Sequence, residues 1–256
     1  MKSPIFIGYA TMVRKEFVRI TRIWSQTLLP PVITTSLYFL IFGGFIGSQV
    51  APIAGYSYMQ FIMPGLVMMT LITSAYMNTV STFYFSKWQR VMDELLVSPM
   101  PNWTIIAGFV TGGLLRAFMV GLLVVGVSMF FTHLSVFNIF ALFSAAFLTA
   151  LLFALAGIIN AIYAKSFDAI SIVPNFVLTP LTYLGGVFYS VEVLPPFFRD
   201  ISYFNPILYM VNAFRYGFLG VSDVSVAMAF SIMGGIVVLL TVWVLVLFKL
   251  GVGIRR

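Results

Sequence analysis

The chain has 256 residues, of which 61% are hydrophobic and only 8% are charged. Soluble domains are about 45–50% apolar and about 25% charged, so this composition excludes a water-soluble fold and makes lipid the natural solvent. The chain has no cysteine, which excludes disulfides, thiolate metal sites and cysteine nucleophiles. Its formal net charge of +7 leaves nucleic acid or an anionic membrane as possible partners.

Residues 1–27 form a basic, amphipathic beginning. Apolar residues recur there at helical spacing, namely Val13, Phe17, Ile20 and Trp24. Basic residues recur on another face of the same helix, namely Lys15, Arg19 and Arg22. Such a helix suits the surface of an anionic leaflet, or it packs on the remainder of the protein. Both interpretations place it at the membrane surface.

Six later runs are apolar and about 20 residues or longer, the length of helix that crosses a hydrocarbon core. They cover residues 28–47, 59–85, 104–131, 137–164, 169–189 and 226–248. Continuously apolar runs predict helices, because the strands of a membrane barrel alternate in polarity. We therefore expect an all-α membrane protein with six transmembrane helices in a single transmembrane domain over residues 1–256.

The distribution of lysine and arginine predicts the orientation of the chain. With a cytoplasmic N-terminus, 11 of the 14 basic residues fall on the cytoplasmic side and two outside, and Arg116 lies within the third run. Short cytoplasmic loops carry such an excess of positive charge. Both termini are therefore predicted to be cytoplasmic, and topology explains the basic charge without nucleic acid.

Residues 86–103 are predicted to form a cytoplasmic loop helix. Ser86 followed by Gln89 is typical of a capping box, and Arg90 is spaced to pair with Asp93 and Glu94. The helix would carry an apolar edge beside its charges. It can dock a soluble partner, or it can be a solvated helix that docks nothing.

The fifth run is irregular, since it contains Pro174, Asn175, Pro180, Gly185 and Gly186. A broken membrane helix is tolerated where protein or a water-filled cavity satisfies its free backbone groups. The run therefore lines an interior or a dimer seam, or it is a kinked helix without a transport role.

The segment 190–221 is aromatic but broken by prolines, including the Asn205–Pro206 pair. Its pieces are too short to span a membrane, so we expect a re-entrant helical hairpin on the extracytoplasmic side, before the last span. Arg199 and Arg215 are expected near the lipid headgroups.

Several functions are excluded by what the sequence lacks. It has no P-loop, no serine-hydrolase or metalloprotease motif and no acidic residue inside a predicted span, so we expect no catalytic residue and no metal site. Arg116 either reaches toward the interface or has a function within the membrane. Energy for active movement would then come from another polypeptide. The alternative is an ATP-independent channel or secondary transporter, which would need ionisable groups along its path.

Three stretches together resemble the ABC-2 family of transporter permeases: Asp93–Ala107, Leu184–Phe197 and Asn205–Gly220. The resemblance covers nearly the whole chain. It implies the membrane-spanning permease subunit of an ATP-binding-cassette exporter in the bacterial inner membrane. It further implies a homodimer with two copies of a cytoplasmic ATPase subunit, which holds the ATP and Mg²⁺ while this chain binds no cofactor. It does not choose between a drug, a lipid and a glycan-like substrate.

The resemblance also implies roles for individual residues. Closure of the ATPases would push on the loop helix and the amphipathic start and rock spans one, two and five about the dimer axis. The residues expected to couple the chain to the ATPase are Arg90, Asp93, Glu94, Leu95, Arg19 and Arg22. The gating candidates are Pro174, Asn175, Pro180, Gly185 and Gly186, and the re-entrant motif is carried by Asn205, Pro206 and Arg215.

Overall fold

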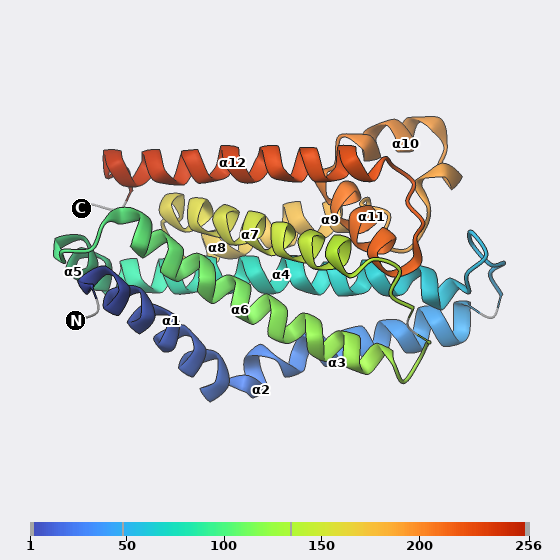
Figure 1. Cartoon of the computed structure of the whole chain (residues 1–256), viewed down its shortest axis with the longest axis horizontal. Coiled ribbons are helices and arrows are strands. Elements are labelled where there is room, and N and C mark those ends of the chain that lie inside the picture. Colours follow the sequence, from blue (N-terminus) through green and yellow to red (C-terminus); the bar gives the residue numbers. More distant parts are fainter. Residues whose placement is uncertain (1–2, 48, 134, 254–256) are drawn as a thin grey trace.

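A computed structural model describes residues 3–47, 49–133 and 135–253. In these ranges the regular structure is helical, with one isolated β-bridge between Ile53 and Tyr56, so the predicted all-α fold class is confirmed. The long helices lie side by side along the longest axis of the molecule (Figure 1). Helix α5 (Val91–Val97) marks one end of the bundle and α10 (Pro196–Tyr203) marks the other; we call these the α5 end and the α10 end.

Five helical segments among the described residues are long and apolar enough to cross a membrane. The first, Trp24–Ile46, joins α2 (Trp24–Thr27), α3 (Leu29–Tyr38) and the π-helical η1 (Phe39–Ile46). The others are α4 (Tyr58–Trp88), α6 (Asn102–Ser128), α7 (Ile139–Tyr163) and α12 (Val226–Leu250). They overlap the first, second, third, fourth and sixth of the apolar runs.

The fifth apolar run forms a shorter, interrupted helix. Here α8 (Phe167–Val173), the π-helical η2 (Pro174–Leu178) and α9 (Thr179–Tyr183) follow one another without a gap. The amide and the hydroxyl of Thr179 both donate to the carbonyl of Pro174, the hydroxyl at 2.9 Å. This five-residue bond widens the helix at a proline, as expected where proline disturbs the regular ladder.

Helix α4 is the centre of the bundle, and most of its side chains are buried among α6, α7 and α11 (Pro206–Leu219). Glycines permit close contacts along it. A Cβ atom on Gly65 would lie 2.7 Å from the carbonyl oxygen of Val187, and one on Gly157 of α7 would lie 2.9 Å from that of Tyr76. Small residues at such crossings are typical of helix packing in membranes.

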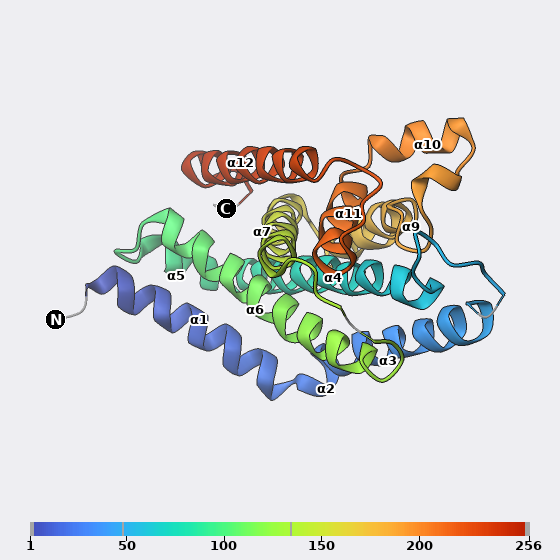
Figure 2. The same cartoon turned by 45° about the vertical axis from the view of Figure 1, so that its right-hand side comes forward.

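The amphipathic start forms α1 (Pro4–Arg22), which begins after the N-cap Ser3. Figures 1 and 2 show α1 sloping from the α5 end toward the middle of the molecule, beside α6. Its contacting face is centred on Glu16 and Ile20, which are 5% and 0% exposed, whereas Phe17 and Trp24 of the predicted apolar stripe are exposed. The predicted helix is present, but its buried stripe is rotated from the predicted one.

The loop helix covers Val91–Val97, so it is shorter than the predicted 86–103 and begins later. Ser86 is a buried residue within α4, which continues to Trp88, so the capping box at Ser86 and Gln89 does not exist. Arg90 is instead the N-cap residue of α5, with a left-handed φ of 61°. In that turn Arg90 forms no ion pair with Asp93 or Glu94.

The α10 end holds the short segments η3 (Val191–Val193), α10 and α11. Most of α11 is buried against α7, α12 and α4, whereas α10 carries exposed apolar side chains such as Phe197 and Phe204. Figure 2 shows α10 projecting beyond the long helices.

Candidate functional site

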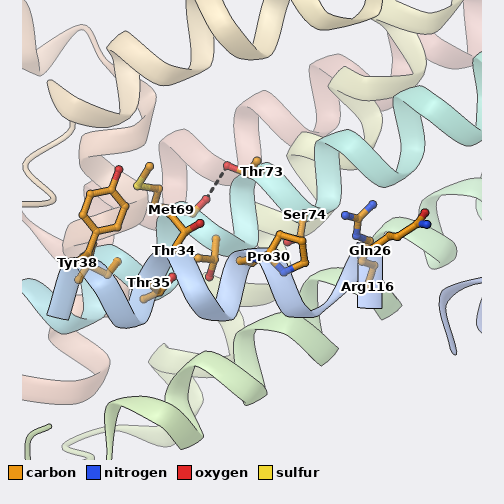
Figure 3. A pocket seen from close by; sticks show the side chains of 12 residues that line it. Gln26, Pro30, Thr34, Thr35, Tyr38, Met69, Thr73, Ser74 and Arg116 are labelled. Carbon is orange, nitrogen blue, oxygen red and sulfur yellow. Dashed lines mark hydrogen bonds between the residues drawn. The ribbon is translucent and has the colours of Figure 1, made fainter. Parts of the chain in front are cut away.

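A cavity with both polar and apolar lining lies between α3, α4 and α6 at the middle of the bundle. Its volume is about 270 Å³. Six hydroxyl side chains line it together with one cation, Arg116 of α6. The full lining is Gln26, Pro30, Pro31, Thr34, Thr35, Tyr38, Leu66, Met69, Thr70, Thr73, Ser74 and Arg116. Figure 3 shows Gln26 and Arg116 at one end of the cavity and Tyr38 at the other. We call this cavity the Arg116 cavity.

A second cavity of about 260 Å³ lies between α4 and the interrupted helix α8–η2–α9. Met69 and Thr73 of α4 line both cavities, so the two are neighbours across one ridge. Two of the predicted gating residues, Pro174 and Asn175, line the second cavity. The first span, α4 and the interrupted helix thus carry a continuous series of hydroxyl and methionine side chains, which we call the polar seam.

An aromatic contact joins the two outer helices of the polar seam. The hydroxyls of Tyr38 and Tyr183 are 3.1 Å apart, although 145 positions separate them in the sequence. The ring of Phe188 packs against both tyrosines and against Phe42, with ring centroids 4.9 to 5.9 Å apart. Such pairs add about 0.5–1.5 kcal/mol beyond the area they bury. This contact holds α3 and α9 together on the α10 side of the Arg116 cavity.

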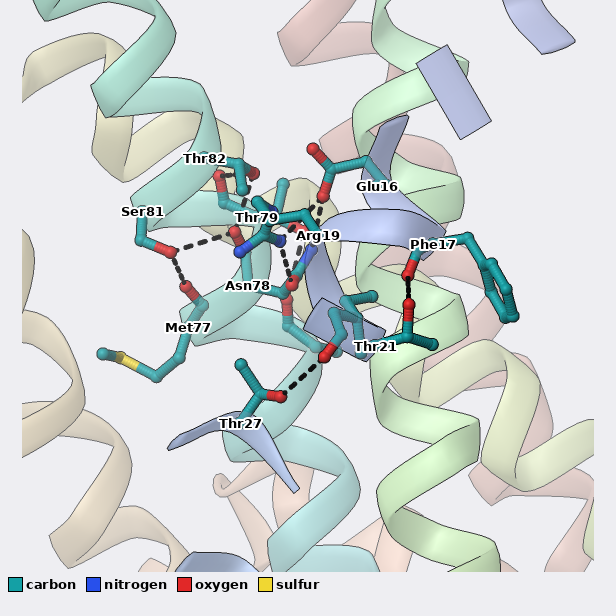
Figure 4. Close-up of polar contacts among 12 residues, drawn as sticks. Glu16, Phe17, Arg19, Thr21, Thr27, Met77, Asn78, Thr79, Ser81 and Thr82 are labelled. Atoms are coloured by element: carbon teal, nitrogen blue, oxygen red, sulfur yellow. Dashed lines mark hydrogen bonds and ion pairs between the residues drawn. The ribbon is translucent and has the colours of Figure 1, made fainter. Parts of the chain in front are cut away.

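A charged cluster attaches α1 to α4 (Figure 4). One carboxylate oxygen of Glu16 accepts from Arg19 at 2.8 Å and from the Asn78 amide at 3.3 Å, and Arg19 also donates to the Asn78 side-chain oxygen at 2.6 Å. Glu16 is buried, so its carboxylate charge needs the partner Arg19, and the buried amide of Asn78 needs its hydrogen bonds. Arg19, predicted to face the ATPase, is therefore bound within the chain.

One face of helix α5 is buried against the protein and the opposite face is exposed. Met92 is fully buried, while Asp93, Glu94 and Val97 are exposed and line a shallow depression of about 520 Å³. Nearby, the ammonium of Lys87 donates to the carbonyls of Ala161, Ile162 and Ala164, which end α7. A cation at the carbonyl end of a helix is favourable, so Lys87 ties α4 to α7 beside α5.

The predicted coupling residues do not share one surface. Arg90, Asp93 and Glu94 lie exposed around α5, and Leu95 packs partly into the core. Arg19 and Arg22 lie in the last turn of α1, at the end of that helix away from α5.

The re-entrant motif meets the end of the interrupted helix. The Asn205 amide donates to the Leu181 carbonyl at 2.6 Å, and its oxygen caps α11 by accepting from the Ile207 amide at 3.0 Å. Pro206 occupies the first turn of α11, where its missing N–H is not needed. Asn205 thus fixes the start of α11 to α9.

Arg215 is buried within the protein rather than exposed at headgroup level. Its side chain is 0% exposed, donates to the Gly186 carbonyl at 2.6 Å, lies 3.8 Å from the Asp223 carboxylate and covers the ring of Phe61 at 3.9 Å. Gly186 has a φ of 71°, which favours glycine and turns its carbonyl toward Arg215. Two gating candidates, Gly185 and Gly186, therefore belong to the packing of the α10 end.

Sequence reasoning missed Glu16, Asn78, Tyr38 and Tyr183. The one available signal was the isolated acid in a basic helix, since Glu16 stands among Arg14, Lys15 and Arg19. The other contacts join residues far apart in the chain, and no local pattern marks them.

Comparison with known proteins identifies the family. The family model described as ABC-2 type transporter matches residues 8–219. The chain belongs to the ABC-2 type transporter family. The match extends from α1 through the end of α11, so it includes the polar seam, α5 and the re-entrant motif.

Two kinds of curated relative resemble this ABC-2 chain over most of their length. The inner membrane transport permease YadH of Escherichia coli K12 is 52% identical over 233 residues, covering 91% of each chain. Nodulation protein J of Rhizobium leguminosarum bv. viciae is 24% identical over 217 residues, covering 84% of this chain and 83% of the relative. The protein of the same name from Neorhizobium galegae is 22% identical over 215 residues.

Proposed function

We propose that the chain is the permease subunit of an ATP-binding-cassette exporter in the bacterial inner membrane. It would act as a homodimer with two copies of a separate cytoplasmic ATPase subunit, which binds ATP and Mg²⁺. Membership of the ABC-2 family supports this function, and so does the 52% identity to an inner membrane transport permease. The observation that carries the proposal is α5, a short helix with exposed acidic and apolar side chains at one end of an otherwise apolar bundle.

The interrupted helix would be an additional span, the fifth of six in chain order. Its three segments have seven, five and five residues, about 25 Å of helix, which is close to the hydrocarbon thickness. With six spans the α5 end faces the cytoplasm together with both termini, in agreement with the distribution of lysine and arginine. Helices α10 and α11 then form a re-entrant pair in the outer leaflet.

Helix α5 would receive the force of the ATPase. Its depression offers the carboxylates of Asp93 and Glu94 beside the apolar side chain of Val97, which suits a basic and apolar partner surface. Arg90 in the preceding turn adds a cation at the edge. Because α5 follows α4 after two residues, a push on α5 reaches the helix that lines both cavities.

The polar seam would be the path of the substrate. It combines the first span, α4 and the interrupted helix, which are the first, second and fifth spans of the proposed topology. Only 11% of the most apolar stretch of the first span is buried within one chain, which leaves surface both for a second copy and for lipid. Two seams facing each other across a dimer axis would enclose one shared path. Pro174, Asn175 and Pro180 would let the fifth span bend there.

The test is capture of the tagged full-length chain from native membranes. We expect it to bring down a polypeptide that hydrolyses ATP, whereas the chain stripped of partners hydrolyses none. Glu94→Lys should reduce the captured ATPase activity about tenfold by reversing a contact charge. Glu192→Lys, at an exposed carboxylate near the α10 end, is the matched control and should change nothing.

Two outcomes would refute the proposal. ATP hydrolysis by the chain alone would contradict a separate ATPase. Transport into vesicles driven by an ion gradient without ATP would favour the channel or secondary transporter instead. Equal loss of activity with Glu94→Lys and Glu192→Lys would remove the coupling role of α5.

A further inference from the structure

Arg116 is a partly exposed cation that has no counter-charge among the described residues. It is the one charged side chain that lines the Arg116 cavity, and none of the ion pairs between described residues includes it. Its Nη2 donates to the Thr27 carbonyl at 3.4 Å, while its Nε is buried and has no hydrogen-bond partner in the described part of the chain. An ionised group in such surroundings is costly unless something pairs with it.

The neighbouring carboxylate is already used. Glu16 accepts from Arg19 and Asn78, so its carboxylate is not available to Arg116. The Arg116 end of the cavity is therefore positive, and no described residue forms an ion pair with Arg116 there. A negatively charged ligand would supply the missing counter-charge for Arg116.

The remaining lining fits an amphiphile better than a free ion. The hydroxyl of Thr70 donates to the Val67 carbonyl at 2.7 Å and that of Thr73 to the Met69 carbonyl at 2.9 Å, so both protons are used within α4 and an anion would be recognised at the Arg116 end. Pro30, Pro31 and Leu66 add an apolar wall. Figure 3 shows that the cavity has a charged end and an uncharged end.

The size and surroundings of the cavity also favour an amphiphile. A volume of about 270 Å³ lies below the usual range for a whole drug-sized ligand, and is enough for a headgroup. Next to it the first span exposes Ile33, Leu37 and Ile41, which are 44% to 54% exposed and would face acyl chains. A headgroup can therefore enter sideways while its hydrocarbon chains stay in lipid.

We propose that the Arg116 cavity binds the phosphate headgroup of a membrane amphiphile, with Arg116 as the recognising cation. Guanidinium binds phosphate through strong charge-assisted hydrogen bonds, and phosphate is the common anion of membrane amphiphiles. This inference rests on the proposed function, because it names the substrate class of the same polar seam. Gln26, at the charged end, is placed to hydrogen-bond the same headgroup.

The experiment measures binding to the purified full-length chain in non-ionic detergent. The probes are dioctanoyl phosphatidate, dioctanoylglycerol with the same tails but no phosphate, and inorganic phosphate alone, with bound probe counted by native mass spectrometry. We expect phosphatidate to bind at least about tenfold more tightly than dioctanoylglycerol. Inorganic phosphate should not displace it at equal concentration.

Variants separate the site from the fold. Arg116→Gln should lower phosphatidate affinity about tenfold, and Arg116→Lys, which keeps the charge, should recover most of it. Arg14→Gln removes an exposed arginine of α1 and should leave binding unchanged. Unfolding temperatures of all three variants show that each remains folded.

Three results would overturn the proposal: equal binding of dioctanoylglycerol and phosphatidate, unchanged binding by folded Arg116→Gln, or displacement of phosphatidate by an equal concentration of inorganic phosphate. The last would make the cavity a site for a free anion. The assay contains neither ATP nor an ATPase, so its failure would leave the permease function standing. Failure of the ATPase capture would likewise leave the binding result unaffected.

Discussion

Two arginines in different surroundings distinguish two regions of this molecule. At the α10 end, the buried Arg215 donates to the Gly186 carbonyl, forms an ion pair with Asp223 at 3.8 Å and covers the face of Phe61, while its Nε and Nη1 have no hydrogen-bond partner among the described residues. In the polar seam, Arg116 has one long bond to the Thr27 carbonyl and lines an open cavity. A compensated charge fixes structure, while an uncompensated one in a cavity is suited to a ligand. The α10 end is thus built for rigidity and the polar seam for binding.

Removal of Arg215 should have the largest effect. Arg215→Leu leaves the Asp223 carboxylate without its counter-charge and frees the Gly186 carbonyl, so we expect a loss of about 3 kcal/mol or more of stability. Thermal unfolding in detergent measures it. Arg199→Leu, at a partly exposed arginine of α10, is the control and should cost less than about 0.5 kcal/mol. Equal losses from the two variants would show that the Arg215 contacts do not stabilise the fold.

Loss of Glu16 should come next. Glu16→Ala leaves Arg19 uncompensated against Asn78, and we expect a loss of about 2 kcal/mol with release of α1 from α4. Protease cleavage within α1 would report the release. Glu94→Ala removes an exposed carboxylate and should leave α1 protected; unaltered protection in Glu16→Ala would argue that the charged cluster does not hold α1.

Substitutions at Gly65 and Gly44 compare the packing near the α10 end with that of the first span. Gly65→Ala places a Cβ 2.7 Å from the Val187 carbonyl oxygen near the α10 end, which should cost about 1–2 kcal/mol. Gly44→Ala in η1 of the first span meets nothing within 4 Å and should be neutral or slightly stabilising. The difference in unfolding temperature measures the contrast. A larger loss at Gly44 would show that the first span is the more tightly packed region.

The smallest effect is expected at Arg116. Arg116→Leu removes an uncompensated charge and one long hydrogen bond, so stability should change by less than about 0.5 kcal/mol or increase. The same unfolding assay compares it directly with Arg215→Leu. A loss as large as that of Arg215→Leu would mean that Arg116 is a structural residue.

The sequence predicts the long spans because their signal is local. Each of five apolar runs carries enough hydrophobic residues in succession to specify a membrane helix, whatever surrounds it. The run 169–189 departs from this pattern, since Pro174 introduces a π-helical segment that depends on a bond to Thr179. Its helix ends at Tyr183, before the glycine turn at Gly185 and Gly186.

The local start of α5 could not be predicted. Ser86 and Gln89 have the spacing of a capping box, but the favourable burial of Ser86 on α4 extends that helix past it. The chain then turns at Arg90 with a positive φ, a conformation rare for residues other than glycine. No propensity argument selects arginine for such a position.

The candidate site was only partly predictable for a different reason. Arg116, Pro174 and Asn175 stand out as unusual residues within apolar runs, and the structure places all three at the two cavities. Tyr38 and Tyr183, or Glu16 and Asn78, meet only after the helices pack. Their importance is a property of the tertiary structure, since tyrosine and asparagine are ordinary in each local segment.

Orientation is the central claim of the proposed function, because a cytoplasmic ATPase could act on α5 only if the α5 end faces the cytoplasm. The chain has no cysteine, so single cysteines can be labelled without background. Val97 at the α5 end and the carboxylate residue Glu192 near the α10 end are both exposed, which makes Val97→Cys and Glu192→Cys a matched pair. With a membrane-impermeant maleimide on intact cells expressing the chain without its partner, we predict labelling of Glu192→Cys alone, and of Val97→Cys only after permeabilisation. Labelling of Val97→Cys in intact cells would contradict the account.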